Sequence, residues 1–276
     1  MDEPFAEYRE IGVADPLRQG DVLEAVDAGA SMWQRHLLVI TADCDFAHVK
    51  HQGRVTCVPI LAAEDYLSEM QIPKIRERLV KQPLKEMRQI LSKSEAPDIS
   101  DRRLREWASE EMPTDIVMRL ELKQADAQKA TAALKVIRMI DAPAQNFKEG
   151  VGSLVEAQLI GESPPKRETA VKKVVSDLRD AYSRPPGDAL FLAAIAPGHD
   201  KGYFGYLRHI EQVREPEISL GPSRRAAKYR RISRMQDRFT HALVQRFAMV
   251  FMSIGLPQQY EDLRNLHSEI LGDDFT

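Results

Sequence analysis

The hydrophobic periodicity of this chain changes twice, and these two changes restrict the fold more than any other feature. Residues 20–61 and 187–210 contain short runs of β-branched and aromatic side chains, whereas residues 62–186 repeat apolar side chains three and four positions apart. Neither β segment alone is large enough to be independently stable. The order strand, helix, strand therefore predicts one β module that a helical insertion divides.

This α+β interpretation divides the chain into four segments. Residues 1–62 supply the first half of the β module, residues 63–186 the insertion, residues 187–222 the second half, and residues 223–276 a basic segment with an amphipathic C-terminal helix. At 276 residues the chain can bury a full hydrophobic core and contain two structural units.

Five runs are predicted to be strands, at residues 21–26, 36–41, 54–61, 189–196 and 202–210. The run HLLVIT at 36–41 is continuously apolar, which is typical of a strand buried on both faces. Asp and Gly residues between the second and third runs supply the turn chemistry of a hairpin.

Helical periodicity covers most of the insertion. Residues 84–91 contain an apolar stripe, residues 123–140 are rich in Ala, Lys and Gln, and residues 167–182 follow the breaker Pro164-Pro165. Residues 115–122 fit a strand and a helix start equally well.

A last helix is predicted from about residue 234 to residue 254. One of its faces collects Phe239, Leu243, Phe247, Val250, Phe251 and Ile254. Such a stripe packs on the core or forms an interface between copies of the chain, so a homo-oligomer through this helix is one expectation.

Charge and composition restrict the environment and the ligands. The 39 Lys and Arg nearly balance the 42 Asp and Glu, so only a local patch could attract a polyanion. The acidic start lacks a signal peptide, no apolar run could span a bilayer, and two cysteines fit a reducing compartment, so we expect a cytoplasmic protein without membrane contact. Common nucleotide-binding and hydrolase motifs are absent, and we expect no cofactor.

The β segments resemble the PemK/MazF toxin family. The matching features are Gly20-Asp21-Val22, Arg35 directly before HLLVIT, the later run VTCVPIL, and residues 206–210 with Val213. They cover about a third of the chain. The resemblance implies a small SH3-like barrel and, for the family, cleavage of single-stranded RNA.

The family's chemistry needs an Arg at the head of the second strand and a Thr or Ser just after the third, which act together on the scissile phosphate. Arg35 fills the first position, but the second falls at Leu61, which cannot transfer a proton. The resemblance therefore implies a non-catalytic accessory or regulatory protein that binds a protein or nucleic acid, in a toxin–antitoxin or phage-defence setting. The alternative is an active endoribonuclease, in which Arg35 works with an acceptor from residues 41–45, such as Asp43 or Asp45.

A basic run follows the second β segment and contains the strongest local charge bias. It contains Arg224, Arg225, Lys228, Tyr229, Arg230, Arg231 and Arg234, with no acidic residue. Phosphate binding with base stacking on the tyrosine is one interpretation. The other is a solvated helix start that pairs with acids of the insertion.

A second alternative function is a zinc-bearing module. Cys44, His48, His51 and Cys57 lie in and beside the segment between two predicted strands, and zinc favours thiolate and imidazole ligands. The opposing interpretation makes Cys57 a buried strand residue and Asp43 and Asp45 turn residues.

Overall fold

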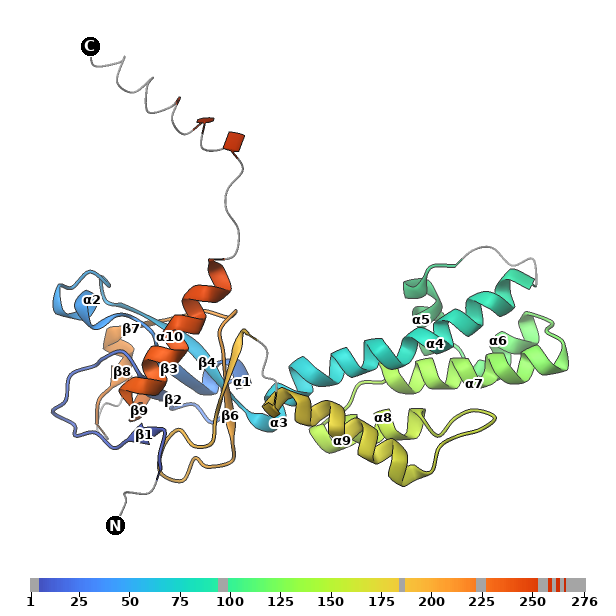
Figure 1. Ribbon diagram of the computed structural model, residues 1–276, viewed down its shortest axis with the longest axis horizontal. Helices are drawn as coiled ribbons and strands as arrows, with labels where there is room; N and C mark the ends of the chain where they lie inside the picture. Colours follow the sequence, from blue (N-terminus) through green and yellow to red (C-terminus); the bar gives the residue numbers. More distant parts are fainter. Residues whose placement is uncertain are drawn as a thin grey trace.

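Strands from both ends of the chain share one curled antiparallel sheet, which we call the half-barrel. A computed structural model describes residues 5–93, 99–183, 187–221 and 227–252, together with positions 258, 259, 262, 263 and 266. A helical insertion at residues 63–183, which we call the arm, interrupts the half-barrel, and a helix follows it near the C-terminus (Figure 1). The predicted α+β fold with a split β module is confirmed.

The half-barrel has nine strands in the described residues. They are β1 Tyr8–Arg9, β2 Asp21–Ala25, β3 His36–Val39, β4 Arg54–Ala62, β5 Ala189–Leu192, β6 Tyr203–Tyr206, β7 Glu211–Arg214, β8 Ile218–Ser219 and β9 Tyr229–Met235. The order is β1-β9-β2-β3-β4-β6-β5, with β7 on β4 and β8 on β9. Because β9 pairs with β2 and β6 pairs with β4, the strands after the insertion complete those before it.

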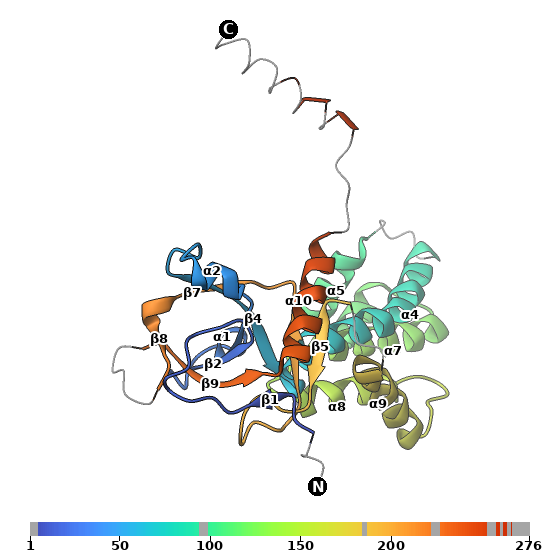
Figure 2. The same ribbon diagram turned by 60° about the vertical axis from the view of Figure 1, so that its left-hand side comes forward.

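Both faces of the central strands are buried, which explains their continuous apolar runs. Leu38 faces a cluster that includes Val22, Val58 and Leu192. Its neighbour Leu37 faces the opposite cluster. The helix α10, Asp237–Phe251, lies against the first of these clusters through Phe239, Leu243, Phe247 and Val250 of its predicted stripe (Figure 2). Phe251 was also predicted on this face, but it is exposed.

The remaining helices lie in the half-barrel loops and in the arm. The loop helices are α1 Met32–Arg35, α2 Asp43–Ala47 and the 3₁₀ turn Glu215–Glu217. The arm contains α3 Ala63–Tyr66, a π-helical turn Leu67–Gln71, α4 Ile72–Lys93, α5 Asp101–Glu110, α6 Pro113–Arg119, α7 Gln124–Asp141, α8 Phe147–Ala157 and α9 Arg167–Ser183. None of the helices in the described residues is long and apolar enough to cross a membrane.

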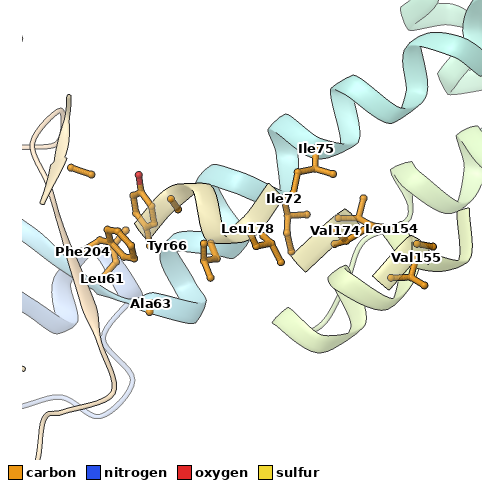
Figure 3. Close-up of a cluster of buried hydrophobic side chains, with 14 residues drawn as sticks. Leu61, Ala63, Tyr66, Ile72, Ile75, Leu154, Val155, Val174, Leu178 and Phe204 are labelled. Atoms are coloured by element: carbon orange, nitrogen blue, oxygen red, sulfur yellow. The ribbon is translucent and has the colours of Figure 1, made fainter. Parts of the chain in front are cut away.

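The arm has two hydrophobic clusters along its length. The outer one joins α4 to α7 and includes Leu84, Met87, Leu134 and Ile137. The inner one anchors the arm to the sheet, where Tyr66 stacks on Phe204 with ring centroids 4.1 Å apart (Figure 3). An aromatic stack of this kind adds to the burial of both rings. The arm therefore begins at the end of β4 and packs directly on β6.

Several local predictions need correction. The predicted strand ends were too long at residues 193–196 and 207–210, and β1, β7 and β8 were not predicted. The hairpin segment between β3 and β4 contains the helix α2, and the ambiguous segment near residue 115 is the helix α6. The basic run is not a helix start, since its described part forms strand β9, and α10 begins only at Asp237.

A buried ion pair explains why the basic run can be a strand. The Asp21 side chain is fully buried, and its oxygens accept from Arg234 Nε at 2.5 Å and from Arg231 Nη1 at 3.3 Å. The two guanidinium groups also donate to the carbonyls of Pro16 and Gly12. Arg231 and Arg234 thus point into the sheet, where they share the carboxylate of Asp21 and two backbone carbonyls.

Replacing Asp21 by Ala should therefore lower the free energy of unfolding by about 3–5 kcal/mol, because two buried guanidinium groups lose their carboxylate. Urea denaturation measures this change. Asp237→Ala is the matched control, since Asp237 is exposed and 4.0 Å from Arg9, and it should cost less than about 1 kcal/mol. Equal effects of the two substitutions would contradict the structural role of Asp21.

Candidate functional site

The predicted nuclease residues have structural partners of their own. Arg35 ends α1, and its Nη2 donates to the carbonyls of Ala28 and Ala30 at 3.1 and 3.0 Å, which closes the loop before α1. Leu61 is fully buried in the inner arm cluster. Of the two positions that the resemblance implies for catalysis, one thus holds a loop-bound arginine and the other a core leucine.

The aspartates at the start of α2 also hold local structure. Asp43 Oδ1 accepts from the backbone N–H of Gln19 at 2.9 Å, and Arg18 Nε lies 3.9 Å from its other oxygen. Asp45 accepts a weak hydrogen bond from the thiol of its neighbour Cys44 at 3.8 Å. Both carboxylates lie in the first turn of α2, where negative charge is favourable.

The structure does not bring the four proposed zinc ligands together. Cys57 is buried in β4, and burial raises the pKa of its thiol, whereas Cys44 is exposed on α2. Both ring nitrogens of His51 are occupied, by Glu215 at 2.8 Å and by the carbonyl of Asp45 at 3.2 Å. His48 is the helix C-cap of α2.

The cationic side chains in the described part of the basic run form ion pairs within the protein. Lys228 Nζ lies 3.0 Å from Glu217, Arg230 pairs with Glu24, and Arg231 is buried on Asp21. Tyr229 is partly buried, which raises its pKa to about 12. Arg224 and Arg225 lie outside the described residues, as does Ile254 of the C-terminal stripe.

A different group of chemically active side chains gathers on the half-barrel. Glu24, His36 and His199 each offer one ligand atom, and these three atoms all lie within 4.8 Å of one another. They form the one such group of potential metal ligands among the residues that the structure describes. We call this group the His–Glu cluster.

Sheet register places two members of the His–Glu cluster side by side. Glu24 on β2 is the cross-strand partner of His36 on β3 and of Arg230 on β9, so all three side chains occupy one face. Arg230 donates from Nε to Glu24 Oε2 at 2.7 Å. The other oxygen, Oε1, faces both histidines, at 3.6 Å from His36 Nε2 and 3.2 Å from His199 Nε2.

A tight turn delivers His199 to this face. The backbone N–H of His199 donates to the carbonyl of Ala196, and Gly198 has a φ of +75°, which glycine adopts without a steric cost. The His199 ring then packs near that of His36, with centroids 5.3 Å apart.

The electrostatics of the His–Glu cluster favour neutral His36 and ionised Glu24. Burial, opposed by the Glu24 charge, lowers the pKa of His36 to about 4. Burial alone would raise the pKa of Glu24, but hydrogen bonds from Arg230 and His199 outweigh it, and the pKa is lowered. At neutral pH the cluster thus contains the Glu24 carboxylate beside the neutral His36 imidazole.

Sequence reasoning missed this cluster because its members are far apart. His199 is separated from Glu24 by 175 positions, and its spacing from the other histidines suggests no motif. Only the cross-strand register of Glu24 and His36 could have been anticipated, from two strands joined by a short connection.

Comparison of the chain with protein-family models, with curated proteins and with solved structures finds no match in any of the three.

The His51–Glu215 pair should make stability depend on pH. The hydrogen bond that His51 donates to the Glu215 carboxylate raises the pKa of His51 above its ordinary 6.5. The pair therefore stabilises the fold fully below about pH 6.5, and this stabilisation is lost as the pH rises through the raised pKa. Replacing Glu215 by Gln should therefore lower the free energy of unfolding more at about pH 5.5 than at about pH 9.

Urea denaturation of both proteins at the two pH values measures the difference. Glu10→Gln, which changes an exposed carboxylate, is the control and should show no such pH dependence. An equal loss of unfolding free energy for Glu215→Gln at both pH values would contradict a pH-dependent His51–Glu215 pair.

Proposed function

We propose that this protein is a non-catalytic accessory protein with a degenerate PemK-like, SH3-like half-barrel, and that its arm binds a protein partner. One observation supports this most strongly. Leu61, the position of the missing proton-transfer residue, is fully buried where the arm leaves the sheet. The end of β4, where the family's chemistry would take place, is thus where the partner-binding arm begins.

Charge pairing favours a protein partner over nucleic acid. Affinity for a phosphate backbone comes from unpaired Lys and Arg. In the described part of the basic run, Lys228, Arg230 and Arg231 are each paired with an internal carboxylate. Arg231 is buried, and nucleic-acid binding through Lys228 or Arg230 would compete with their carboxylate partners.

The arm offers a groove of suitable size, lined by α4, α7 and residues 157–162 at and after the end of α8. Its cavity measures about 870 Å³, and its floor is apolar, with Leu79, Ile90, Val136 and Ile140. Its rim carries both charge signs, with Glu86, Lys93, Asp126, Lys129 and Glu162. An apolar floor with a mixed rim suits an amphipathic helix, which buries one face and pairs its flanking charges. We assign the groove to such a helix from a partner protein.

The proposal includes the setting that the PemK/MazF resemblance implies, a toxin–antitoxin or phage-defence system. An accessory protein there would recognise a protein component through the arm, while the half-barrel supports the arm as a rigid base.

Single-stranded RNA should be neither cleaved nor bound tightly by this protein. Denaturing gels report cleavage, and fluorescence anisotropy over a salt series reports binding, with Arg35→Ala alongside. Wild type and variant should give the same negative cleavage result. Cleavage that disappears in Arg35→Ala would instead establish the endoribonuclease, and tight, salt-dependent binding without cleavage would favour a nucleic-acid partner.

Partner binding should depend on the groove. Ala132→Arg places a long charged side chain in the groove on α7, whereas Ala125→Arg places the same side chain on an exposed position of α7 outside it. A partner identified by co-purification and then reconstituted from purified components should lose affinity at least about tenfold with Ala132→Arg, since a buried charge disrupts an apolar interface. Calorimetry with Ala125→Arg should match wild type.

Equal partner affinity of the Ala132→Arg and Ala125→Arg variants would show that the partner does not bind in the groove. A chain that instead forms dimers, broken only by Ala132→Arg in size-exclusion chromatography, would show that a second copy occupies the groove.

A further inference from the structure

We propose that Glu24, His36 and His199 bind one divalent transition-metal ion of the zinc class on the half-barrel. Their three ligand atoms come from β2, β3 and the turn before β6, and all lie within 4.8 Å of one another. This inference is independent of the partner that the arm binds.

His36 supplies the first argument, because its Nε2 is a buried polar atom without a hydrogen-bond partner. The side chain is only 9% exposed, and Nε2 points at Glu24 Oε1 from 3.6 Å, beyond hydrogen-bonding distance. Buried polar atoms in folded proteins are nearly always paired. A metal ion between His36 and Glu24 would supply the missing partner.

His199 supplies the second argument through its tautomer. Its Nδ1 lies 3.1 Å from the carbonyl oxygen of Pro197, which can only accept, so Nδ1 carries the proton. In the neutral ring Nε2 then has a lone pair, and this lone pair faces the carboxylate oxygen of Glu24 at 3.2 Å. Two acceptors at that distance are satisfied by a second proton on the ring or by a metal ion between them, and the metal ion also satisfies His36 Nε2.

The outer contacts match those of a metal site. Histidine ligands usually donate their second ring N–H to a carbonyl or carboxylate, as His199 does to Pro197. Arg230 holds Glu24 Oε2 at 2.7 Å, which leaves Oε1 directed at the two histidines. Ligand atoms about 2 Å from a tetrahedral zinc ion lie about 3.3 Å apart, close to the observed 3.2 and 3.6 Å.

The ligand types select the class of ion. Two imidazoles and one carboxylate suit zinc and neighbouring first-row ions, whereas Mg²⁺ and Ca²⁺ prefer oxygen ligands. Glu24 and His199 are partly exposed, at 19% and 23% of their side chains, so an ion can enter from solvent. Three protein ligands leave a fourth position for water or a ligand from a partner.

Metal binding to the full chain tests the proposal. The chain is stripped with chelator and titrated with Zn²⁺ by calorimetry at about pH 7.5, where histidine is neutral enough to ligate. We expect one ion per chain, no comparable binding of Mg²⁺, and a higher thermal unfolding midpoint with Zn²⁺. Titration with Co²⁺ should produce the visible absorption bands of a low-symmetry site.

His199→Ala is the decisive variant, since His199 lies on a surface turn and its loss leaves the sheet intact. It should weaken Zn²⁺ binding by more than about tenfold, the smallest effect expected even for an outer contact, and abolish the Zn²⁺-dependent rise in the unfolding midpoint. The controls are His241→Ala, at an exposed position of α10, and Cys44→Ser, at an exposed position of α2. Both should bind Zn²⁺ as wild type does.

Two results would overturn the proposal. One is the lack of stoichiometric Zn²⁺ binding, which would indicate that a proton on His199 neutralises Glu24 instead. The other is binding that survives His199→Ala but is lost in Cys44→Ser, which would place the ion elsewhere. Neither result bears on RNA cleavage or on the arm groove, so the two proposals fail separately.

Discussion

The buried carboxylate of Asp21 is the interaction on which the rest of this structure depends. It joins β2, near the start of the chain, to Arg231 and Arg234 of β9, more than 200 positions later. Two arginines could not otherwise enter the interior of a sheet, since an unpaired buried charge is strongly unfavourable. The register of β2 on β9 shifts between Val22 and Leu23, and beyond this irregularity Glu24 pairs with Arg230 at the surface.

The sequence predicted the helices and strands whose pattern of apolar residues lies within one short segment. Runs such as HLLVIT and the 3.6-residue stripes of the insertion predict elements directly, and their order predicts a divided β module. The YRRISRM segment of β9 was missed because its inward positions are arginines, whose burial depends on an acid far along the chain. The His–Glu cluster escaped for the same reason, since a turn near residue 198 must first fold His199 back onto the sheet.

The aromatic stack of Tyr66 on Phe204 gives the arm its position. It lies where β4 ends and the insertion begins, so the arm's inner cluster is continuous with the sheet. The outer cluster, by contrast, contacts only helices of the arm. The arm thus has a base that is fixed to the sheet and a separate core farther out (Figure 1).

The divided sheet also governs the order in which a growing chain can acquire structure. When β2, β3 and β4 leave the ribosome, their partners β6, β7 and β9 have yet to be made, and unpaired strand edges invite aggregation. The insertion that follows has mainly short-range helical contacts, which form quickly. The arm can therefore fold before the sheet is complete. The half-barrel is completed only when residues 229–235 have been synthesised and β9 pairs with β2.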